Sequence, residues 1–201
     1  MMEKKYISFD VETSGKTPGK YSMLSLGACV VGEREKTFYR EFKPISKEFI
    51  VEALRVASVG LQCLDDFKQR DEYNPHHQHF NPARVLELLN EKGDSPQQVM
   101  KKYAEWVLIN TSGFKPVEAA APIKFDGRFT AYYFDNFYDG DNPFGHSGED
   151  MNSVYRGLVG RVDASMKELG LRTEGLIHNA LEDALQQAQE FEEVLSRLKT
   201  K

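Results

Sequence analysis

The stretch KKYISFDVE, residues 4–12, has the composition and the alternation of a β-strand that ends near Glu12. Side chains on a strand alternate between its two faces, so Phe9 shares one face with the apolar residues two positions away on either side. Asp10 and Glu12 share the opposite face and lie about 7 Å apart along the strand. The pattern therefore predicts a strand with an apolar side and an acidic side.

Two carboxylates on one side of a buried strand repel each other, and their burial without partners is unfavourable. A divalent cation would relieve both problems, and hard oxygen ligands of this kind suit Mg²⁺ or Mn²⁺. Asp-x-Glu is a common pattern, so a solvated strand end is the alternative interpretation of Asp10 and Glu12.

The pattern beyond this strand predicts a hairpin and then alternating helices. Two further strands are expected over 23–31 and 36–44, joined by GERE. Helices are expected over 47–59, over 96–110 with Ser95 as cap, over 126–138, and over 180–198 at the end; 115–125 is a short strand candidate, 140–150 a loop, and 151–160 a helix or strand. A hairpin-led sheet followed by alternating helices predicts an α/β or a mixed α+β architecture.

Residues 65–94 are polar and irregular, and they are the best candidate for an insertion, although 83–91 looks helical. Three histidines, His76, His77 and His79, lie within this segment and could bind a transition metal. No cysteine or acidic spacing completes a recognised site, so a polar loop is the favoured interpretation.

Composition restricts the class of protein. A chain of 201 residues with 40% hydrophobic residues predicts one folded domain, 1–201. The net charge of −5 argues against a broad basic face for nucleic acid, although divalent cations can offset a local acidic cluster. Cys29 and Cys63 fit neither a zinc spacing nor a disulfide framework. No signal peptide and no membrane-spanning run is recognised, which predicts a cytoplasmic protein.

The stretch HNALEDA, residues 178–184, opens the last predicted helix with a histidine and an acid. Five positions rotate by about 500° on a helix, so His178 and Asp183 cannot share one helical face. They can meet if Asn179 is the N-cap, with Glu182 completing a capping box. The two positions that normally form a hydrophobic staple would then hold an imidazole and a carboxylate, which indicates part of an active site.

A further acid, Asp126, follows an apolar run at the expected start of the aromatic helix. An ordinary N-cap is the simpler interpretation of this residue when it is considered alone. Asp135 is a competing acid, ranked lower because it falls inside the helix or late in it.

Taken in order, the three motifs are Asp10-x-Glu12, Phe125-Asp126-x-x-Phe129 and His178-x-x-x-x-Asp183. In this order the chain resembles the DEDDh 3′-5′ exonucleases, a family of the ribonuclease-H-like superfamily that includes proofreading exonuclease subunits, oligoribonuclease and ribonuclease T. The first and last motifs match the family closely. Many members carry a His-Asn pair shortly before the Phe-Asp, whereas this chain has AAAPIKFD. The long separation between the first and second motifs agrees with the suspected insertion.

The resemblance implies an α/β, ribonuclease-H-like fold with a mixed central sheet flanked by helices, and with an insertion between the first sheet strands and the second acidic motif. It also implies a 3′-5′ exonuclease that releases nucleoside 5′-monophosphates from single-stranded DNA or RNA, or from short 3′ tails. It implies that four carboxylates hold two Mg²⁺ or Mn²⁺ ions, namely Asp10, Glu12, Asp126 and Asp183. His178 is the implied general base, and imidazole titrates near neutral pH, which suits that role. Relatives that dimerise make a homodimer reasonable.

By the same resemblance, Thr13 and Ser14 are expected to line the pocket for the terminal nucleotide, and Leu24 or Leu26 to wedge against its base. The alternative for both leucines is plain strand core. Two other functions stay open. One is a catalytically silent nucleic-acid-binding or accessory module on the same fold, and the other is a metal-dependent phosphatase acting on small esters.

Overall fold

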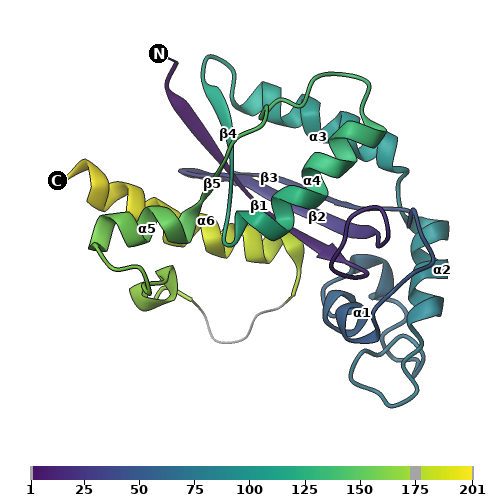
Figure 1. Cartoon of the computed structure of the whole chain (residues 1–201). Helices are drawn as coiled ribbons and strands as arrows, with labels where there is room; N and C mark the ends of the chain where they lie inside the picture. Colours follow the sequence, from purple (N-terminus) through teal and green to yellow (C-terminus); the bar gives the residue numbers. More distant parts are fainter. Residues whose placement is uncertain (1, 173–177, 201) are drawn as a thin grey trace.

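The structure is a computed structural model that describes residues 2–172 and 178–200. Its centre is a five-stranded mixed sheet with the order β3-β2-β1-β4-β5 (Figure 1). The strands are β1 (Lys4–Thr13), β2 (Met23–Val30), β3 (Glu33–Glu41), β4 (Lys115–Ala120) and β5 (Gly148–Asp150). Central strand β1 pairs antiparallel with β2 and parallel with β4. The predicted α/β architecture with a mixed sheet is confirmed.

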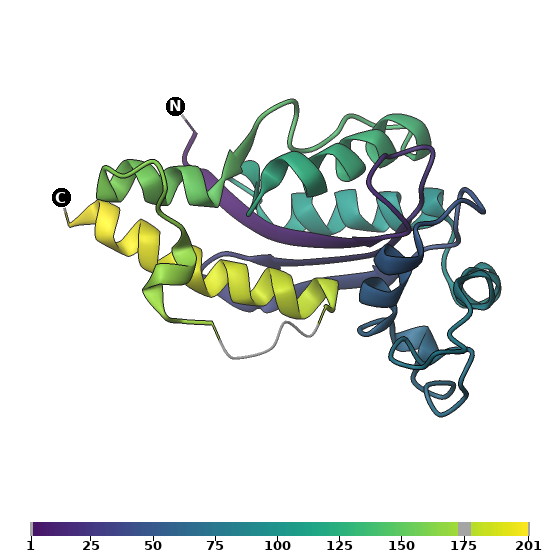
Figure 2. The same ribbon diagram turned by 60° about the horizontal axis from the view of Figure 1, so that its bottom comes forward.

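Helices cover both faces of the sheet (Figure 2). On one side lie α3 (Pro96–Asn110) and α4 (Ile123–Phe137), and on the other lies α6 (Ala180–Lys199) with α5 (Met151–Val159) packed beside it. Because α6 contacts both β1 and β2, the last motif of the chain is brought over the first.

The predicted alternation of β1 is confirmed by its packing. Phe9 and its apolar neighbours on the same face are buried in the core under α3 and α4. Asp10 and Glu12 lie on the face that α6 covers. The strand therefore delivers its acids to one side and its core residues to the other.

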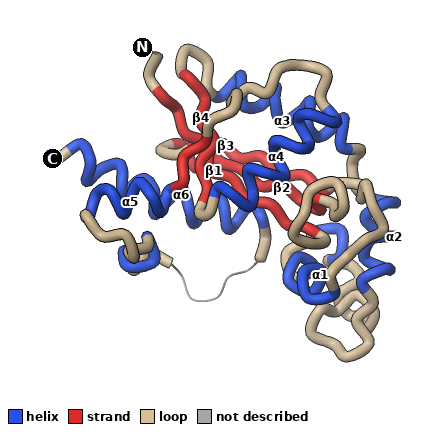
Figure 3. Tube along the Cα trace, viewed as in Figure 1, coloured by secondary structure: helices blue, strands red, loops and turns tan. Residues whose placement is uncertain are grey.

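Beyond the end of β1, a smaller group of elements forms one corner of the molecule (Figure 3). It contains α1 (Val51–Ser58), the 3₁₀ helix η1 (Gln62–Leu64) and α2 (Pro82–Lys92). A separate apolar cluster that includes Leu54, Leu64 and Leu89 holds the corner together. The helix expected inside the proposed insertion is confirmed as α2.

Several element boundaries differ from the prediction. The segment 123–125, expected to continue a strand, forms the first turn of α4, because β4 ends at Ala120 and Pro122 is the N-cap. Proline fixes φ and has no N–H, so it suits the start of a helix better than a strand interior. The expected loop 140–150 ends in β5, and 151–160 is a helix. Within the described residues, no helix combines the length and apolar character that a membrane crossing requires.

Candidate active site

A cavity of about 450 Å³ lies where the end of β1, the start of α4 and the start of α6 meet. We call it the acid cavity. The structure places the five residues of the three motifs on its wall: Asp10, Glu12, Asp126, His178 and Asp183. Residues separated by up to 173 positions are thus brought to one site by the central position of β1 in the sheet.

From β1, Glu12 reaches the acid cavity with 9% of its surface exposed, and Asp10 is half-buried. The side chain of Gln187, on α6, donates a hydrogen bond from Nε2 to Oδ1 of Asp10 at 3.2 Å. Asp10 is therefore held from the helix that also carries the last acid of the site.

Asp126 lies in the first turn of α4 and not at its N-cap. It is only 4% exposed, and its Oδ1 accepts a hydrogen bond from the backbone N–H of Val11 at 3.3 Å. Negative charge is favourable in the first turn of a helix, where backbone N–H groups point outward. The middle motif is thereby joined directly to the strand that carries Asp10 and Glu12.

The start of α6 is fixed by Asn179, as predicted. Its Oδ1 accepts hydrogen bonds from the N–H groups of Leu181 and Glu182 at 3.0 and 3.2 Å. The capping box expected with Glu182 is not formed in the described residues, where the side chain of Asn179 alone caps the helix. The cap places Asp183 in the first turn, facing the cavity.

Two glycines allow the backbone around this helix start to pack closely. A Cβ on Gly27 of β2 would lie 2.1 Å from the backbone nitrogen of Leu181. A Cβ on Gly60 would lie 2.3 Å from the carbonyl oxygen of His178. Real Cβ atoms do not approach backbone this closely, so both positions require glycine for α6 to lie where it does.

His178 itself adopts φ of 48°, a left-handed conformation that non-glycine residues seldom adopt. The next residue, Asn179, donates from Nδ2 to the carbonyl oxygen of Gly60 at 2.7 Å. The turn after α1, which contains Gly60, therefore holds the backbone next to His178 in place. Strained backbone of this kind is found mostly where surrounding contacts hold a functional group in place.

Glu12, His178 and Asp183 each offer a metal-ligand atom, and these atoms lie within 4.8 Å of one another. Among the described residues this is the one group of three or more such side chains that meets this spacing. The histidines expected in the polar loop, His77 and His79, contact each other by their rings without forming such a group.

Burial and mutual repulsion make the acid cavity unfavourable for ionised carboxylates. Burial, followed by the charges of Asp126 and its acidic neighbours, raises the pKa of Asp10 well above its usual range. Burial likewise raises the pKa of Glu12 to about 8 and that of Asp126 to about 7. The pKa of Asp183 is raised by burial too, although the nearby His178 and Arg172 oppose the shift.

Phe125 of the middle motif also lines the cavity, and three polar residues on its wall were not singled out from the sequence: Arg172, Gln186 and Gln187. Arg172 forms an ion pair from Nε to Oε1 of the fully buried Glu190 at 2.9 Å. Gln186 donates to the carbonyl oxygen of Leu171 at 3.3 Å. The spacing of Gln187 four residues after Asp183 could have identified it, because these positions share a helical face.

The four predicted substrate contacts are not brought to the acid cavity. Leu24 and Leu26 are fully buried in two apolar clusters, which is the strand-core alternative. The hydroxyl of Thr13 donates to the Gly15 carbonyl, and that of Ser14 to the Glu48 carbonyl, so both hold the loop after β1.

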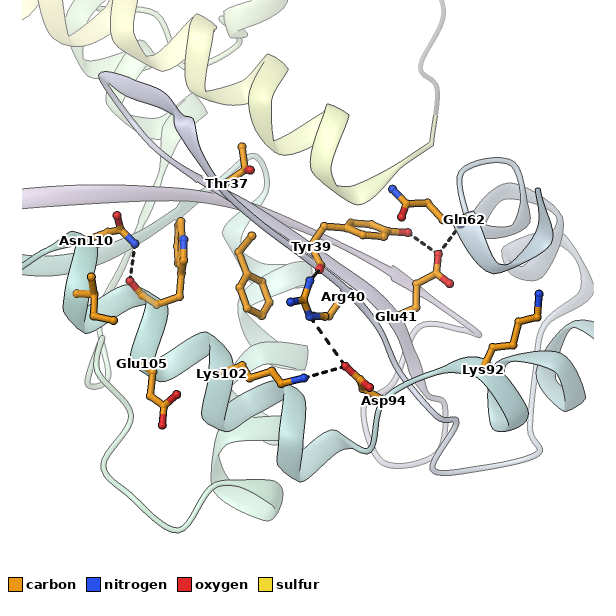
Figure 4. A pocket seen from close by; sticks show the side chains of 13 residues that line it. Thr37, Tyr39, Arg40, Glu41, Gln62, Lys92, Asp94, Lys102, Glu105 and Asn110 are labelled. Carbon is orange, nitrogen blue, oxygen red and sulfur yellow. Dashed lines mark hydrogen bonds and ion pairs between the residues drawn. The ribbon is translucent and has the colours of Figure 1, made fainter. Parts of the chain in front are cut away.

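A larger cavity, of about 750 Å³, lies along β3 and α3 (Figure 4). We call it the β3–α3 groove. Three of its charged residues pair with one another: Asp94 is 3.3 Å from Lys102 and 3.9 Å from Arg40. None of the five motif residues lies on its wall.

The central sheet, with its β1 flanked by an antiparallel and a parallel neighbour, is the ribonuclease-H-like fold. No protein-family model matches the chain. The 3′-5′ DNA exonuclease Cap18 of Escherichia coli is 36% identical over 196 residues, which cover 92% of this chain and 89% of that protein. The chain therefore belongs to the DEDDh family of 3′-5′ exonucleases and is a hydrolase that acts on nucleic acid.

Two solved structures show the same fold. The nuclease domain of 3′hExo, a DEDDh family member bound to rAMP, has a TM-score of 0.64 at 15% identity, covering 96% of this chain and 91% of that one. The zinc-bound complex of Escherichia coli exonuclease I with single-stranded DNA has a TM-score of 0.64 at 16% identity. That match covers 98% of this chain but 41% of exonuclease I.

Proposed function

We propose that the protein removes nucleotides from the 3′ end of single-stranded DNA or RNA, and that two Mg²⁺ or Mn²⁺ ions bind in the acid cavity. The observation that carries the proposal is the meeting of four carboxylates and a histidine in that one cavity. DNA is the first substrate to test, because the relative at 36% identity is a DNA exonuclease.

The residues fit divalent cations. Asp10, Glu12, Asp126 and Asp183 supply hard oxygen ligands, which Mg²⁺ and Mn²⁺ prefer. Burial is the main cause of their raised pKa values and crowded like charges add to it, and a bound cation would offset both effects. When bound, two such ions stabilise both the attacking and the leaving oxygen of an in-line displacement at phosphorus.

His178 acts as the general base that takes a proton from the attacking water. It lies on the wall of the acid cavity beside Glu12 and Asp183, in the group whose ligand atoms are within 4.8 Å of one another. Its backbone is held by the contacts of Asn179 and Gly60, so the ring can accept the proton without a movement of α6.

Two other residues of the cavity wall suit the substrate. The ring of Phe125, directly before Asp126, is 36% exposed and offers a stacking surface for the terminal base. Arg172 places a guanidinium on the same wall, where it attracts the phosphate groups of the strand.

The product is a nucleoside 5′-monophosphate. The whole chain, 1–201, acts as one exonuclease domain with 65–94 as its insertion.

The rival functions use fewer of these features. A catalytically silent binding module needs no general base and no complete set of acids, yet all five residues are present. A phosphatase for small esters needs no surface for a neighbouring base, such as Phe125 provides.

The test is a time course on 5′-labelled single-stranded DNA and RNA with Mg²⁺ or Mn²⁺, run beside His178→Ala and a chelated control. We expect a ladder that shortens from the 3′ end and that both controls abolish. If the labelled strand stays at full length under every metal condition while the protein is folded, the result would support the silent module instead. Hydrolysis of p-nitrophenyl phosphate without mononucleotide release from the oligonucleotide would support the phosphatase.

A further inference from the structure

Gln187 joins three elements of the acid cavity although it is neither an acid nor a histidine. It lies one helical turn after Asp183 on α6 and shares its face. Its side chain is 6% exposed, donates to Asp10 Oδ1 at 3.2 Å, and accepts from the backbone N–H of Ala121 at 2.8 Å. One amide therefore connects α6, β1 and the turn between β4 and α4.

The orientation of this amide is determined by its partners. The backbone N–H of Ala121 can only donate, so the oxygen of Gln187 must face it. The Nε2 group is left for Asp10, and a carboxylate accepts such a bond in its ionised form. Both ends of the buried amide are thus satisfied, which fixes its conformation.

The bond also fixes the carboxylate. Within the described residues, Gln187 is the one side chain that donates to Asp10. With Oδ1 held by this bond, the direction of Oδ2 is set as well. The contact with Ala121 meanwhile holds the turn that leads into α4 and Asp126. Gln187 therefore sets the relative positions of three of the four acids.

We propose that Gln187 is a positioning residue that orients Asp10 for binding of a divalent cation. The inference rests on the proposed function, because it requires Asp10 to be a ligand. Residues that hydrogen-bond to metal ligands orient them, and their loss lowers metal affinity or activity by about 10–100-fold.

The first experiment is a calorimetric titration of the full-length protein with Mn²⁺, without substrate. Gln187→Met keeps the side-chain length and removes both hydrogen bonds. We expect its Kd for Mn²⁺ to rise by about 10-fold or more. The matched control is Gln189→Met on the same helix, whose amide contacts Arg34 outside the cavity. Equal affinities of Gln187→Met and the wild type would overturn the proposal.

A second variant separates positioning of Asp10 from support of the turn. With Mn²⁺ bound and the new carboxylate ionised, Gln187→Glu can still accept from the backbone N–H of Ala121 but cannot donate to Asp10. We expect its Kd for Mn²⁺ to rise by about 10-fold or more, as for Gln187→Met, and the rate at a Mn²⁺ concentration near the wild-type Kd to fall with an unchanged KM for the oligonucleotide. A wild-type Kd for Mn²⁺ in this variant would show that the residue only holds the turn, and the proposal would be wrong.

Failure of the proposed function gives a different result. In that case the wild type does not shorten the labelled strand. Any Mn²⁺ that it binds is bound equally well by Asp10→Asn. Thermal unfolding of each variant, measured alongside, shows whether a loss of affinity accompanies a loss of folded protein.

Discussion

The acid cavity and the β3–α3 groove differ in the arrangement of their charges more than in their size. The groove is larger, at about 750 Å³ against about 450 Å³, but its Asp94 is matched by Arg40 and Lys102 on an exposed surface. In the acid cavity, Glu12 and Asp126 are buried beside other carboxylates. Buried charge that the protein itself leaves uncompensated is therefore a better sign of a catalytic site than volume.

The sharpest test of this comparison removes one charge from each cavity. Glu12→Gln is expected to lower the exonuclease rate by about 10³-fold, because the proposed function makes Glu12 a metal ligand and its loss would remove several kcal/mol of transition-state stabilisation. Asp94→Asn is expected to leave the rate within about twofold, since its partners are solvated. Initial rates on labelled single-stranded DNA with Mn²⁺ measure both. Similar losses in the two variants would contradict the distinction.

The backbone beneath the acid cavity gives the next largest effect. Gly60→Ala puts a Cβ where the carbonyl of His178 lies, so the histidine must move. A displacement of about 1 Å can lower a rate by about 10²-fold, and we expect kcat to fall by that order.

The control for this variant is Gly157→Ala, at an exposed position of α5 where a new Cβ meets no atom within 4 Å. Alanine favours a helix interior over glycine by about 0.5–1 kcal/mol, so this variant should be slightly more stable and fully active. A fully active Gly60→Ala, measured in the same assay, would show that the turn does not hold His178.

The pH dependence of stability should also distinguish the acid cavity. Burial raises the folded-state pKa of Glu12 to about 8 and that of Asp126 to about 7. The folded protein then binds more protons than the unfolded chain between about pH 4 and pH 8. The contribution of these carboxyls to the stability of the metal-free protein is therefore largest below that window and falls as the pH rises through it.

Divalent cations should reverse this trend, because they bind the ionised carboxylates of the folded state. At 100 times the Kd the gain is about 2.7 kcal/mol, or a rise in Tm of about 5–10 °C. Thermal unfolding at pH 5 and pH 8, with Mn²⁺ and with chelator, measures both effects. A metal-free Tm that increases from pH 6 to pH 8 would argue against crowded, uncompensated acids.

The parts of the site that the sequence predicts are those that depend on local rules. The alternation of β1 determines the face of Asp10 and Glu12, and the cap at Asn179 determines where α6 begins. Both follow from a few neighbouring residues. The order of the motifs, compared with the DEDDh family, then indicated the fold and the class of enzyme.

The parts that were missed depend on distant partners or on ambiguous local patterns. Helical spacing places Gln187 beside Asp183, but nothing in the sequence shows that Gln187 contacts Asp10 and Ala121 or that Arg172 contacts Glu190. The apolar run before Asp126 is short, and periodicity does not distinguish a strand from a helix start there. The apolar character of Leu24 likewise suits a core and a substrate wedge equally, and only packing separates the two.

The smallest expected effect concerns the stability contributed by the groove. Asp94 pairs with Lys102 and Arg40, but all three side chains are between 40% and 49% exposed. Solvent screens such pairs, and each contributes about 0–1 kcal/mol. Asp94→Asn keeps the backbone bonds that Asp94 makes to Glu41 and Lys43, so we expect a loss of at most about 1 kcal/mol that disappears in 1 M salt. Urea unfolding at low and high salt measures it. A larger, salt-independent loss would mean that Asp94 depends on its charged partners as strongly as a buried charge does. The exposed fraction of the charged side chains would then no longer distinguish the groove from the acid cavity.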